Sequence, residues 1–347
     1  MYKLMHKNDL VLDVDDGHVR VHNKHILPFD LRHIETVKYE HWLNWLKRRL
    51  TSISRTYMNQ LYKQRRLGRG HVEVINDSAA ISPVDSFWVT RDLLSHTWDS
   101  LQQLRDENMA TVLATLEGVL DKDEMAKNIK LGIPEDHTSI LTTKGAFPKA
   151  VYKGHILKKG NNAEYEVSAY KLGHKLGIDV AVASEYENGM ISCEIFTSDQ
   201  ESLVHMLEYL YPFDVPTYRD IYVKSLEVVS HSEALTRQME KLFMFNYLCS
   251  NFDLHGENFG LIYCTESFEI MRVAPAFDFN SAFDVYEDVL MYDLDIVNNL
   301  ARFINNNKEL LPKLGQVETF LSTDPYLSKE QKSSIVDRAD YLVSLVR

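Results

Sequence analysis

Apolar positions in the first seventy residues predict short strands followed by two helices. Residues 9–30 read as short strands around an Asp-Asp-Gly turn. Apolar residues recur near helical spacing from Trp42 to Leu50, so we expect a helix over about 37–50. A second helix of the same kind is expected over about 54–66.

The middle of the chain reads as a boundary followed by a hairpin, a helix and a strand. Polar helices are expected over 91–130, and Gly132-Ile133-Pro134 is an acceptable boundary after them. A turn at Lys153-Gly154 joins two strand-like pieces, and the helix that follows has its stop at Gly177. Gly189–Phe196 reads as a further strand. The pieces of the hairpin are Ala150–Tyr152 and His155–Leu157.

From Ser198 onward the chain is predicted to be mostly helical. Ser232 opens a helix whose last part, Leu242–Cys249, is too apolar on all sides for a surface helix. Strand formers follow in Phe259–Tyr263 and Ile270–Val273. A helix is expected over Leu290–Ile304, and a capping box at Ser328–Gln331 opens a last helix over about 329–345.

Composition is that of an ordinary globular chain. Its 347 residues are 45% hydrophobic and 25% charged, which is enough for one large bilobal domain or for two domains. Apolar runs stay well short of the ~20 residues that span a membrane, and the first residues lack an apolar signal core. Three cysteines without C-x-x-C spacing favour a reduced, cytoplasmic protein without structural zinc.

Charge is unevenly distributed along the chain. Of the net charge of −12, residues 1–70 contribute +7, from 14 Lys and Arg against 7 Asp and Glu, so the remainder carries −19. The remainder is too acidic for a general nucleic-acid binder. Basic residues near the ends of the two N-terminal helices, Lys47–Arg49 and Lys63–Arg66, suggest a helix-turn-helix that contacts DNA through residues 40–70. The favoured explanation is simpler, because basic residues in a helix's last turn complement its dipole and face water.

Two polar stretches, Asn251–Gly260 and Ala274–Asn280, carry the candidate chemistry. Asp253 and Asn258 stand five residues apart, and Asp278 comes twenty residues after Asn258. Phosphoryl transfer from ATP uses such a set: one carboxylate orients and deprotonates the acceptor hydroxyl, while an amide oxygen and a second carboxylate hold Mg²⁺. Protein-kinase catalytic loops space their Asp and Asn in the same way. Asp, Asn and Gly also gather in ordinary turns, but here a buried helix and a hairpin would hold the loops in place.

These stretches resemble the catalytic segment of the HipA-like kinase family. The family pattern is approximately N-x-D-x-H-x-x-N-F-G, a strand pair, and then A-P-x-[YF]-D, which Asn251–Gly260 and Ala274–Asp278 supply. Typical eukaryotic kinases carry His where Asn251 stands and Gly where Asn280 stands, so their phenylalanine switch is not assumed here. The resemblance implies Asp253 as catalytic base, with Asn258 and Asp278 as magnesium ligands. His255 is assigned to shaping the loop.

The resemblance also implies the nucleotide-binding residues. Lys158, at the end of the second hairpin strand, would bind the α- and β-phosphates, and Lys159 points the other way. The carboxylate partner of Lys158 would be Glu166, which the family's E-x5-L pattern favours over Glu164. By kinase logic the backbone near Glu194–Phe196 would meet adenine.

A segment before the hairpin resembles the family's T-T-x-G-x-x-P-K pattern, which covers the phosphates. The matching residues include Gly145 and Lys149. Because this loop carries the regulatory serine in some members, the resemblance implies autophosphorylation at Ser139, Thr142 or Thr143. Further upstream, Ser82–Trp88 resembles an S-x-x-D-x-[FY]-W segment of some members, and we expect Phe87 and Trp88 to be buried.

The predicted fold is α+β: a bilobal protein-kinase-like (HipA-like) domain after an accessory region. The accessory region covers 1–134 with short strands and basic helices, the N-lobe 135–200, and the mainly helical C-lobe 201–347 with the catalytic loop. The expected activity is that of a serine/threonine protein kinase using ATP and Mg²⁺, of toxin or regulatory type. The resemblance implies a protein substrate such as an aminoacyl-tRNA synthetase, and an antitoxin partner. A small-molecule kinase of the aminoglycoside or lipid type, or a pseudokinase that binds or tethers to DNA, remain alternatives.

Overall fold

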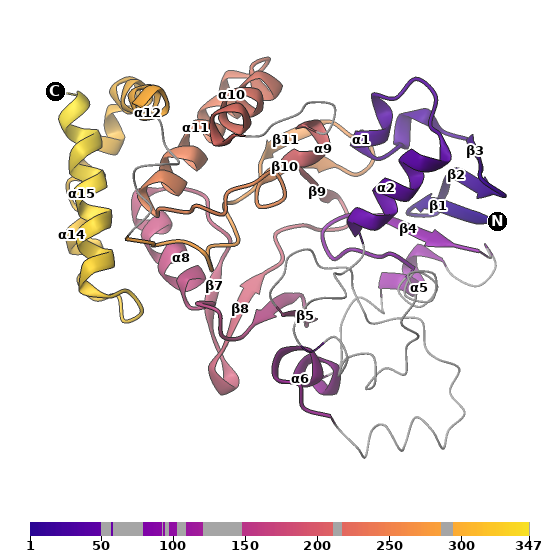
Figure 1. Ribbon diagram of the computed structural model, residues 1–347, viewed down its shortest axis with the longest axis horizontal. Helices are drawn as coiled ribbons and strands as arrows, with labels where there is room; N and C mark the ends of the chain where they lie inside the picture. Colours follow the sequence, from indigo (N-terminus) through magenta and orange to yellow (C-terminus); the bar gives the residue numbers. More distant parts are fainter. Residues whose placement is uncertain are drawn as a thin grey trace. The chain divides into compact units, whose positions relative to one another are not determined.

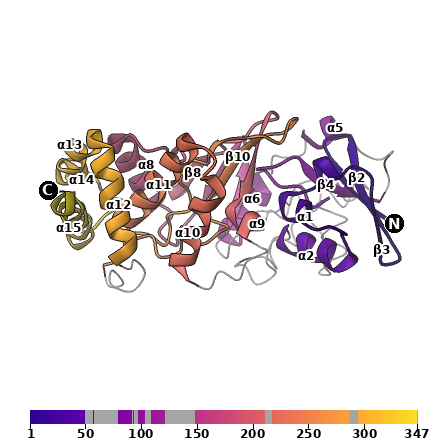
Figure 2. The same cartoon turned by 90° about the horizontal axis from the view of Figure 1, so that it is seen from above.

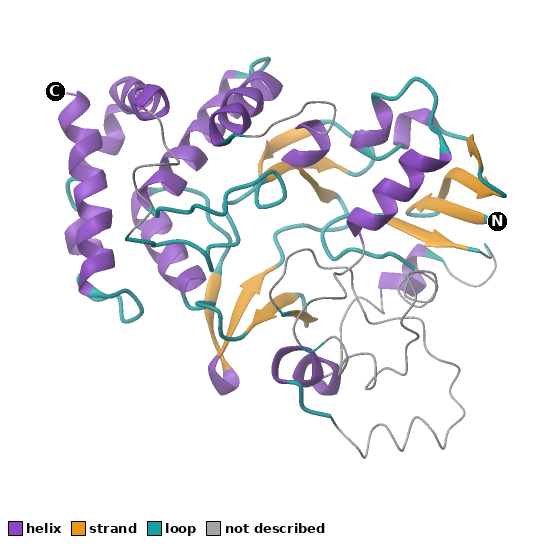
Figure 3. Cartoon of the chain, viewed as in Figure 1, coloured by secondary structure: helices purple, strands orange, loops and turns teal. Residues whose placement is uncertain are grey.

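The computed structural model describes residues 1–49, 57, 79–91, 93, 97–102, 109–120, 148–210, 217–285 and 294–346. Figures 1 and 3 show the elements. The strands are β1 Tyr2–His6, β2 Asp9–Asp15, β3 His18–Val21, β4 Phe87–Thr90, β5 Lys149–Tyr152, β6 His155–Lys158, β7 Ala183–Tyr186, β8 Met190–Glu194, β9 Glu201–His205, β10 Gly260–Cys264 and β11 Ile270–Val273. The helices are α1 Phe29–Arg32, α2 Tyr39–Arg49, α5 Trp98–Gln102, α6 Met109–Glu117, α8 Tyr165–Leu176, α9 Met206–Leu210, α10 Tyr218–Val229, α11 Glu233–Leu248, α12 Leu294–Asn306, α13 Leu311–Leu314, α14 Val317–Leu321 and α15 Lys329–Val346.

Contacts divide the chain into two compact units that interleave in the sequence. Unit 1 comprises Met1–Lys159, Ser192–Ser202 and Cys264–Glu269, and unit 2 comprises Gly160–Ile191, Leu203–Tyr263 and Ile270–Arg347. The predicted boundaries at 134 and 200 follow the sequence rather than the contacts, and they stay a prediction.

The N-terminal sheet has the strand order β3-β2-β1-β4. Asp16 and Gly17 join β2 to β3 with φ of 45° and 77°, the backbone that a tight two-residue hairpin turn requires. Asp15 lies opposite His18 across this turn. The strands expected over 9–30 are therefore confirmed as far as Val21, but Lys24–Ile26 form a 3-10 helix and Phe29 begins helix α1.

Helix α2 is fixed to this sheet through Arg49. The Arg49 guanidinium donates to both carboxylate oxygens of Asp85 at 2.6 and 2.9 Å, and also to the carbonyls of Ala80 and Phe87. Asp85 in turn accepts from the Phe87 amide at 2.9 Å. The aspartate of the S-x-x-D-x-F-W segment thus pairs with a buried arginine.

These contacts correct in part the expectation that the basic end of the first helix faces water. Lys47 is exposed as expected, whereas Arg49 is buried and the partly exposed Arg48 bonds to the buried Asp30. Both guanidiniums therefore have partners within the protein. The expected second helix over 54–66, with Lys63–Arg66, lies outside the described residues.

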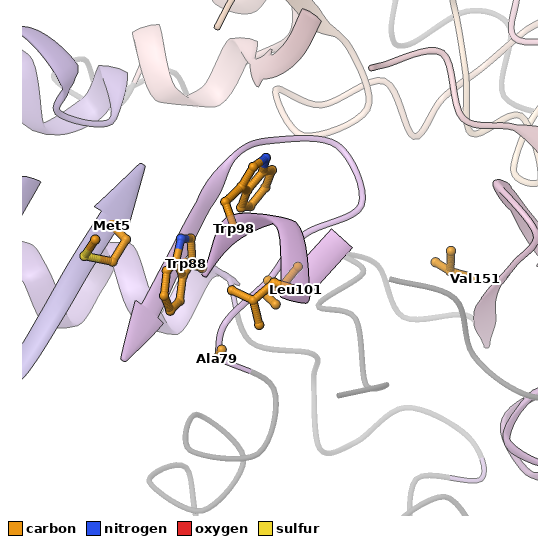
Figure 4. Close-up of a cluster of buried hydrophobic side chains, with 7 residues drawn as sticks. Met5, Ala79, Trp88, Trp98, Leu101 and Val151 are labelled. Atoms are coloured by element: carbon orange, nitrogen blue, oxygen red, sulfur yellow. The ribbon is translucent and has the colours of Figure 1, made fainter. Parts of the chain in front are cut away.

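A hydrophobic cluster packs against β4. It contains Trp88, whose indole N–H donates to the Lys7 carbonyl at 2.7 Å, and Trp98 and Leu101 of α5. Figure 4 shows these side chains. The expected burial of Phe87 and Trp88 is confirmed, with 4% and 1% of each residue exposed. The cluster also includes Met5, Ala79, Ile81 and Val151.

The region 91–130 differs from the polar helices that were expected. Helix α6 buries Val112, Ala114 and Leu116, so it is an apolar helix in this structure. Much of the remainder, including 121–130, lies outside the described residues.

A four-stranded sheet has the order β5-β6-β8-β7. Lys153 and Gly154, with φ of 49° and 74°, turn β5 into β6 as expected. Lys149 lies opposite Lys158 in the antiparallel register, and Lys158 is the last residue of β6. Helix α8 ends as predicted at Gly177, whose φ of 73° suits the left-handed cap that glycine favours.

A three-stranded sheet, β11-β10-β9, positions the loop before β10. The expectation of mostly helices from Ser198 onward is wrong over β9, Glu201–His205. This strand pairs with β10, about sixty residues later, so its partner could not be read from local sequence. Gly260 permits the close approach, because a Cβ there would collide with the Val204 carbonyl.

Helices make up most of the C-terminal part, as Figure 3 shows. Ser232 caps α11 by accepting from the Leu235 amide, and the apolar end of α11 is buried as predicted. The capping box is confirmed, since Ser328 Oγ accepts from the Gln331 amide at 3.2 Å and Gln331 Oε1 accepts from the Ser328 amide at 2.8 Å. Figure 2 shows α12 and α15 beside each other. Among the described residues, no helix is both long and apolar enough to cross a membrane.

Candidate functional site

The loop between α11 and β10 is closed by hydrogen bonds to Asp253. The Asn258 side-chain amide donates to the Asp253 carbonyl at 2.8 Å, and the His255 amide donates to the same oxygen at 2.9 Å. Asn258 is 6% exposed, whereas the Asp253 side chain is 44% exposed. The loop thus holds the Asn258 side chain inside and leaves the Asp253 carboxylate accessible to solvent.

His255 contributes to the shape of this loop. Its Nδ1 accepts from the Glu257 amide at 3.2 Å, while its Nε2 lies 3.7 Å from the Asp253 carboxylate, beyond hydrogen-bond length. This geometry agrees with a loop-shaping role, which stays a prediction.

One pair of buried asparagines, Asn251 and Asn246, supports the loop. Asn251, which is fully buried, donates its side-chain amide to Asn246 Oδ1 at 2.8 Å and its backbone amide to the Asn246 carbonyl at 3.0 Å. Asn246 was missed from the sequence. Its signal was a lone amide in the apolar run Leu242–Cys249, because buried polar groups need partners.

Burial also raises the pKa of the Cys249 thiol at the end of the helix, so that thiol stays protonated.

The β10–β11 hairpin brings the two polar stretches together. The Ala274 amide donates to the Gly260 carbonyl at 2.9 Å. Gly260 lies two residues after Asn258, and Ala274 lies four residues before Asp278, so this bond joins the two stretches. Asp278 is half-buried and adopts a left-handed backbone with φ of 67°. Such conformations gather at functional sites, where the surroundings enforce them.

Helix α8 contacts the residue after Asp278. Glu166, in the first turn of α8, is 4% exposed, and its Oε1 accepts from the Phe279 amide at 3.0 Å. The Phe279 ring is fully buried and meets Phe245 of α11 edge-on, with ring centroids 5.4 Å apart. Unit 2 therefore brings together Asp253, Asn258, Asp278 and Glu166 on connected elements.

The predicted phosphate-binding lysines lie in unit 1. Lys158 is 8% exposed, and Lys149 is half-buried on the neighbouring strand. Lys159 bonds to Glu117 at 2.8 Å, as expected for a residue whose side chain points to the other face. Since Lys158 and Glu166 belong to different units, their pairing stays a prediction.

The segment expected to meet adenine also lies in unit 1. Glu194 ends β8 and is exposed, and Phe196 is half-buried. The intervening Ile195 donates its amide to the Gly154 carbonyl at 3.2 Å, so this segment is bonded to the β5–β6 turn. Gly145 and the expected phosphorylation sites Ser139, Thr142 and Thr143 lie outside the described residues.

Among the described residues, no three His, Cys, Asp or Glu side chains gather to hold a metal ion. Asn258 and Asp278 offer an amide oxygen and a carboxylate, which are ligand types that Mg²⁺ accepts. Their role as metal ligands stays a prediction.

Comparison with known proteins defines the class. A model of the HipA-like C-terminal domain matches residues 138–338, more than half of the chain. The chain therefore belongs to the HipA-like family, and its fold is α+β and kinase-like. The chain has no significant match among curated proteins.

Two solved structures are similar to it. HipA of the Shewanella oneidensis MR-1 toxin–antitoxin system, solved with HipB and operator DNA, is 16% identical with a TM-score of 0.58, and the match covers 100% of this chain and 96% of that one. The Helicobacter pylori proinflammatory kinase CtkA is 20% identical over 57% of this chain and 90% of that one, with a TM-score of 0.37. At 16% identity, the similarity to the Shewanella HipA structure is evidence for the fold alone. With a TM-score of 0.37, the similarity to CtkA supports no argument.

Proposed function

We propose that the protein is a HipA-type kinase that transfers the γ-phosphate of ATP to a serine or threonine hydroxyl. One observation carries the proposal: the Asn258 amide bonds to the Asp253 carbonyl in a loop that the hairpin joins to Asp278. This arrangement supplies an accessible carboxylate for the acceptor and an amide and a second carboxylate for the metal, the set that phosphoryl transfer requires.

Each residue has a distinct part in the reaction. Asp253 orients the acceptor hydroxyl and takes its proton, and it is exposed enough to meet a protein substrate. Asn258 Oδ1 and the Asp278 carboxylate hold Mg²⁺, which neutralises charge on the phosphates when it is bound. Glu166 acts on this set through the Phe279 amide, which keeps the backbone next to Asp278 in place.

Lys149 and Lys158 fit a polyphosphate. They lie directly opposite each other on antiparallel strands, so both side chains leave the same face of the sheet. Two ammonium groups on one face of the sheet can both contact a phosphate chain. Pairing of Lys158 with Glu166 completes the proposal. We also propose that Glu194–Phe196 contacts adenine and that Gly145 belongs to the loop over the phosphates.

Family membership supports a proposal for the acceptor and the partners. Because the Shewanella HipA structure holds HipB and operator DNA, we propose a regulatory or toxin-type kinase with a protein substrate and an antitoxin partner. Ser139, Thr142 and Thr143 are the proposed sites of autophosphorylation. The proposed substrate class includes translation components such as an aminoacyl-tRNA synthetase.

The test is phosphate transfer by the full chain with Mg-ATP and purified candidate substrates. Asp253→Ala and Asp278→Ala should each lower the rate by about 100-fold or more, because they remove the base and a metal ligand. Glu266→Ala, which changes an exposed acid on the β10–β11 turn, is the matched control and should keep the rate. Near-normal transfer by Asp253→Ala would overturn the proposal, and phosphate found only on small molecules would favour the small-molecule kinase.

A further inference from the structure

Gln331 of α15 connects three parts of unit 2. Its Nε2 donates to the Tyr165 hydroxyl of α8 at 2.8 Å and to the Phe283 carbonyl at 3.0 Å. Its Oε1 accepts from the Ser328 amide in the capping box. Both ends of this side chain are therefore engaged. Only the Oε1 end was foreseeable as a capping residue, whereas the two Nε2 bonds reach residues 166 and 48 positions away.

These bonds fix both ends of the segment that follows Asp278. At its start, the Phe279 amide donates to Glu166. At its end, the Phe283 carbonyl accepts from Gln331, which also bonds to Tyr165. Tyr165 and Glu166 are consecutive residues of the first turn of α8. The first turn of α8, together with α15, therefore contacts the segment at both its ends.

The segment needs such support because its backbone is strained. Asp278 and Phe283 have φ of 67° and 63°, and this region is unfavourable for a bulky residue such as phenylalanine. Three contacts hold Phe283 there. Its amide donates to the Cys249 carbonyl at 2.6 Å, its carbonyl accepts from Gln331, and its ring packs edge-on against Tyr165 at 5.3 Å.

The C-terminal helices support α8 at two further points. Ser168, which is buried, donates to Asp324 at 3.0 Å, and Lys313 donates to the Leu176 carbonyl at the end of α8 at 2.9 Å. Helix α8 is thus bonded along its length to the region 313–331. In regulated protein kinases, the helix that carries the glutamate of the Lys–Glu pair changes position, and the activation loop changes between ordered and disordered states.

We propose that Gln331 is a positioning residue that keeps Asp278 in its metal-binding conformation by fixing the Phe279–Phe283 segment to α8. This proposal rests on the proposed kinase function. Helix α15 would therefore affect catalysis through Gln331, although Gln331 itself does not touch the reacting atoms. Through these hydrogen bonds, helix α8, helix α15 and the Phe279–Phe283 segment form one bonded assembly.

Gln331→Glu separates the two roles of the side chain. A glutamate keeps an oxygen for the Ser328 amide, since glutamate is itself a favoured capping-box residue. It replaces the Nε2 donor with an oxygen that faces the Phe283 carbonyl. We expect kcat to fall about 10-fold or more, the Mg²⁺ concentration for half-maximal rate to rise several-fold, and the KM for ATP to change less than about twofold.

Two further variants act as controls. Ser328→Ala removes the cap of α15 but retains the Gln331 Nε2 bonds, so it should lower the melting temperature and leave kcat within about twofold. Tyr165→Phe keeps the ring contact with Phe283 and removes one of the two partners of Nε2, so it should show a smaller fall in kcat than Gln331→Glu. A fall in kcat that follows the melting temperature across all three variants would overturn the positioning role.

Hydrogen exchange gives a readout that does not depend on activity. In Gln331→Glu the amides of Phe279 and Phe283 should exchange faster than in the wild type, while in Ser328→Ala faster exchange should be confined to the start of α15. Unchanged exchange at 279–283 in Gln331→Glu would overturn the proposal. An active wild type with an equally active Gln331→Glu would overturn the positioning role alone, whereas a wild type without phosphate transfer would overturn the proposed function and this role with it.

Discussion

At the scale of single residues, His6 is a buried histidine that is neutral in the folded protein. It is 3% exposed and lies between the rings of Phe87 and Phe268, with centroids 5.0 and 4.8 Å away. Burial, and then the charge of Lys7, lowers the pKa of His6 from 6.5 to about 4. The imidazole therefore stays neutral in the folded protein at neutral pH.

His6 should make stability depend on pH. Between about pH 6.5 and pH 4 the unfolded chain binds a proton at His6 that the folded protein does not, so stability falls as pH falls through this window. This proton binding at His6 lowers the free energy of unfolding by at most ~3 kcal/mol. His6→Phe should therefore lose less stability than the wild type between pH 7 and pH 4.5, as measured by urea unfolding at each pH.

The control for His6 is His18→Phe, which changes an exposed histidine on β3. It should lose as much stability as the wild type over the same range. If His6→Phe and the wild type have parallel pH profiles, the buried, neutral state assigned to His6 is wrong.

Single residues also show what the sequence could reveal of the site. Asp253, Asn258 and Asp278 could be proposed from the sequence because their spacing is local, and the β10–β11 hairpin joins the two stretches that carry them. Gln331 and Tyr165 were missed because their partners are distant in the chain. A glutamine inside a capping box carries no sign that its other end bonds to the segment after Asp278.

At the scale of elements, α8 depends on a close approach at Gly173. A Cβ at this position would collide with the Val180 side chain and lie 3.3 Å from the Phe245 ring. Val180 pairs in turn with Ala276, two residues before Asp278. The absence of a side chain at Gly173 therefore lets helix α8 approach the segment that leads to Asp278.

Gly173→Ala should destabilise the protein by about 1–3 kcal/mol, because overpacking outweighs the better helix propensity of alanine. Thermal unfolding measures the change. Gly315→Ala is the matched control: Gly315 is exposed, has an ordinary helical φ of −67°, and meets its nearest atoms at 3.7 Å. It should be neutral or stabilising by up to ~1 kcal/mol. A Gly173→Ala protein as stable as Gly315→Ala would refute the close-packing argument.

Elements with local signals were predictable, and those with distant partners were not. The turn at Lys153-Gly154, the stop at Gly177 and the capping box at Ser328 each mark an element boundary within a few residues. Strand β9 has no such marker, and its pairing with β10 depends on a glycine some sixty residues away. Arg49 looked like an exposed helix end because its partner, Asp85, is 36 positions away.

At the scale of the whole molecule, the predicted accessory region does not stand apart from the rest of unit 1. Phe268, at the tip of the β10–β11 hairpin, packs against His6, Phe29 and Phe87. Ile195, between β8 and β9, packs against the cluster around Trp88 and Trp98. Segments far along the chain therefore complete the core that the first hundred residues begin.

This interleaving predicts that a fragment of residues 135–347, which spans the family match, is not an independent folding unit. It retains Val151, Ile195 and Phe268 but lacks the tryptophans and aromatic rings that bury them. Exposure of these apolar side chains should make the fragment bind a hydrophobic dye and melt without the cooperative transition of the full chain. Addition of separately expressed residues 1–134 should reduce dye binding, because those residues carry the missing faces of unit 1. A fragment that melts cooperatively within a few degrees of the full chain would instead support the predicted boundary at residue 134.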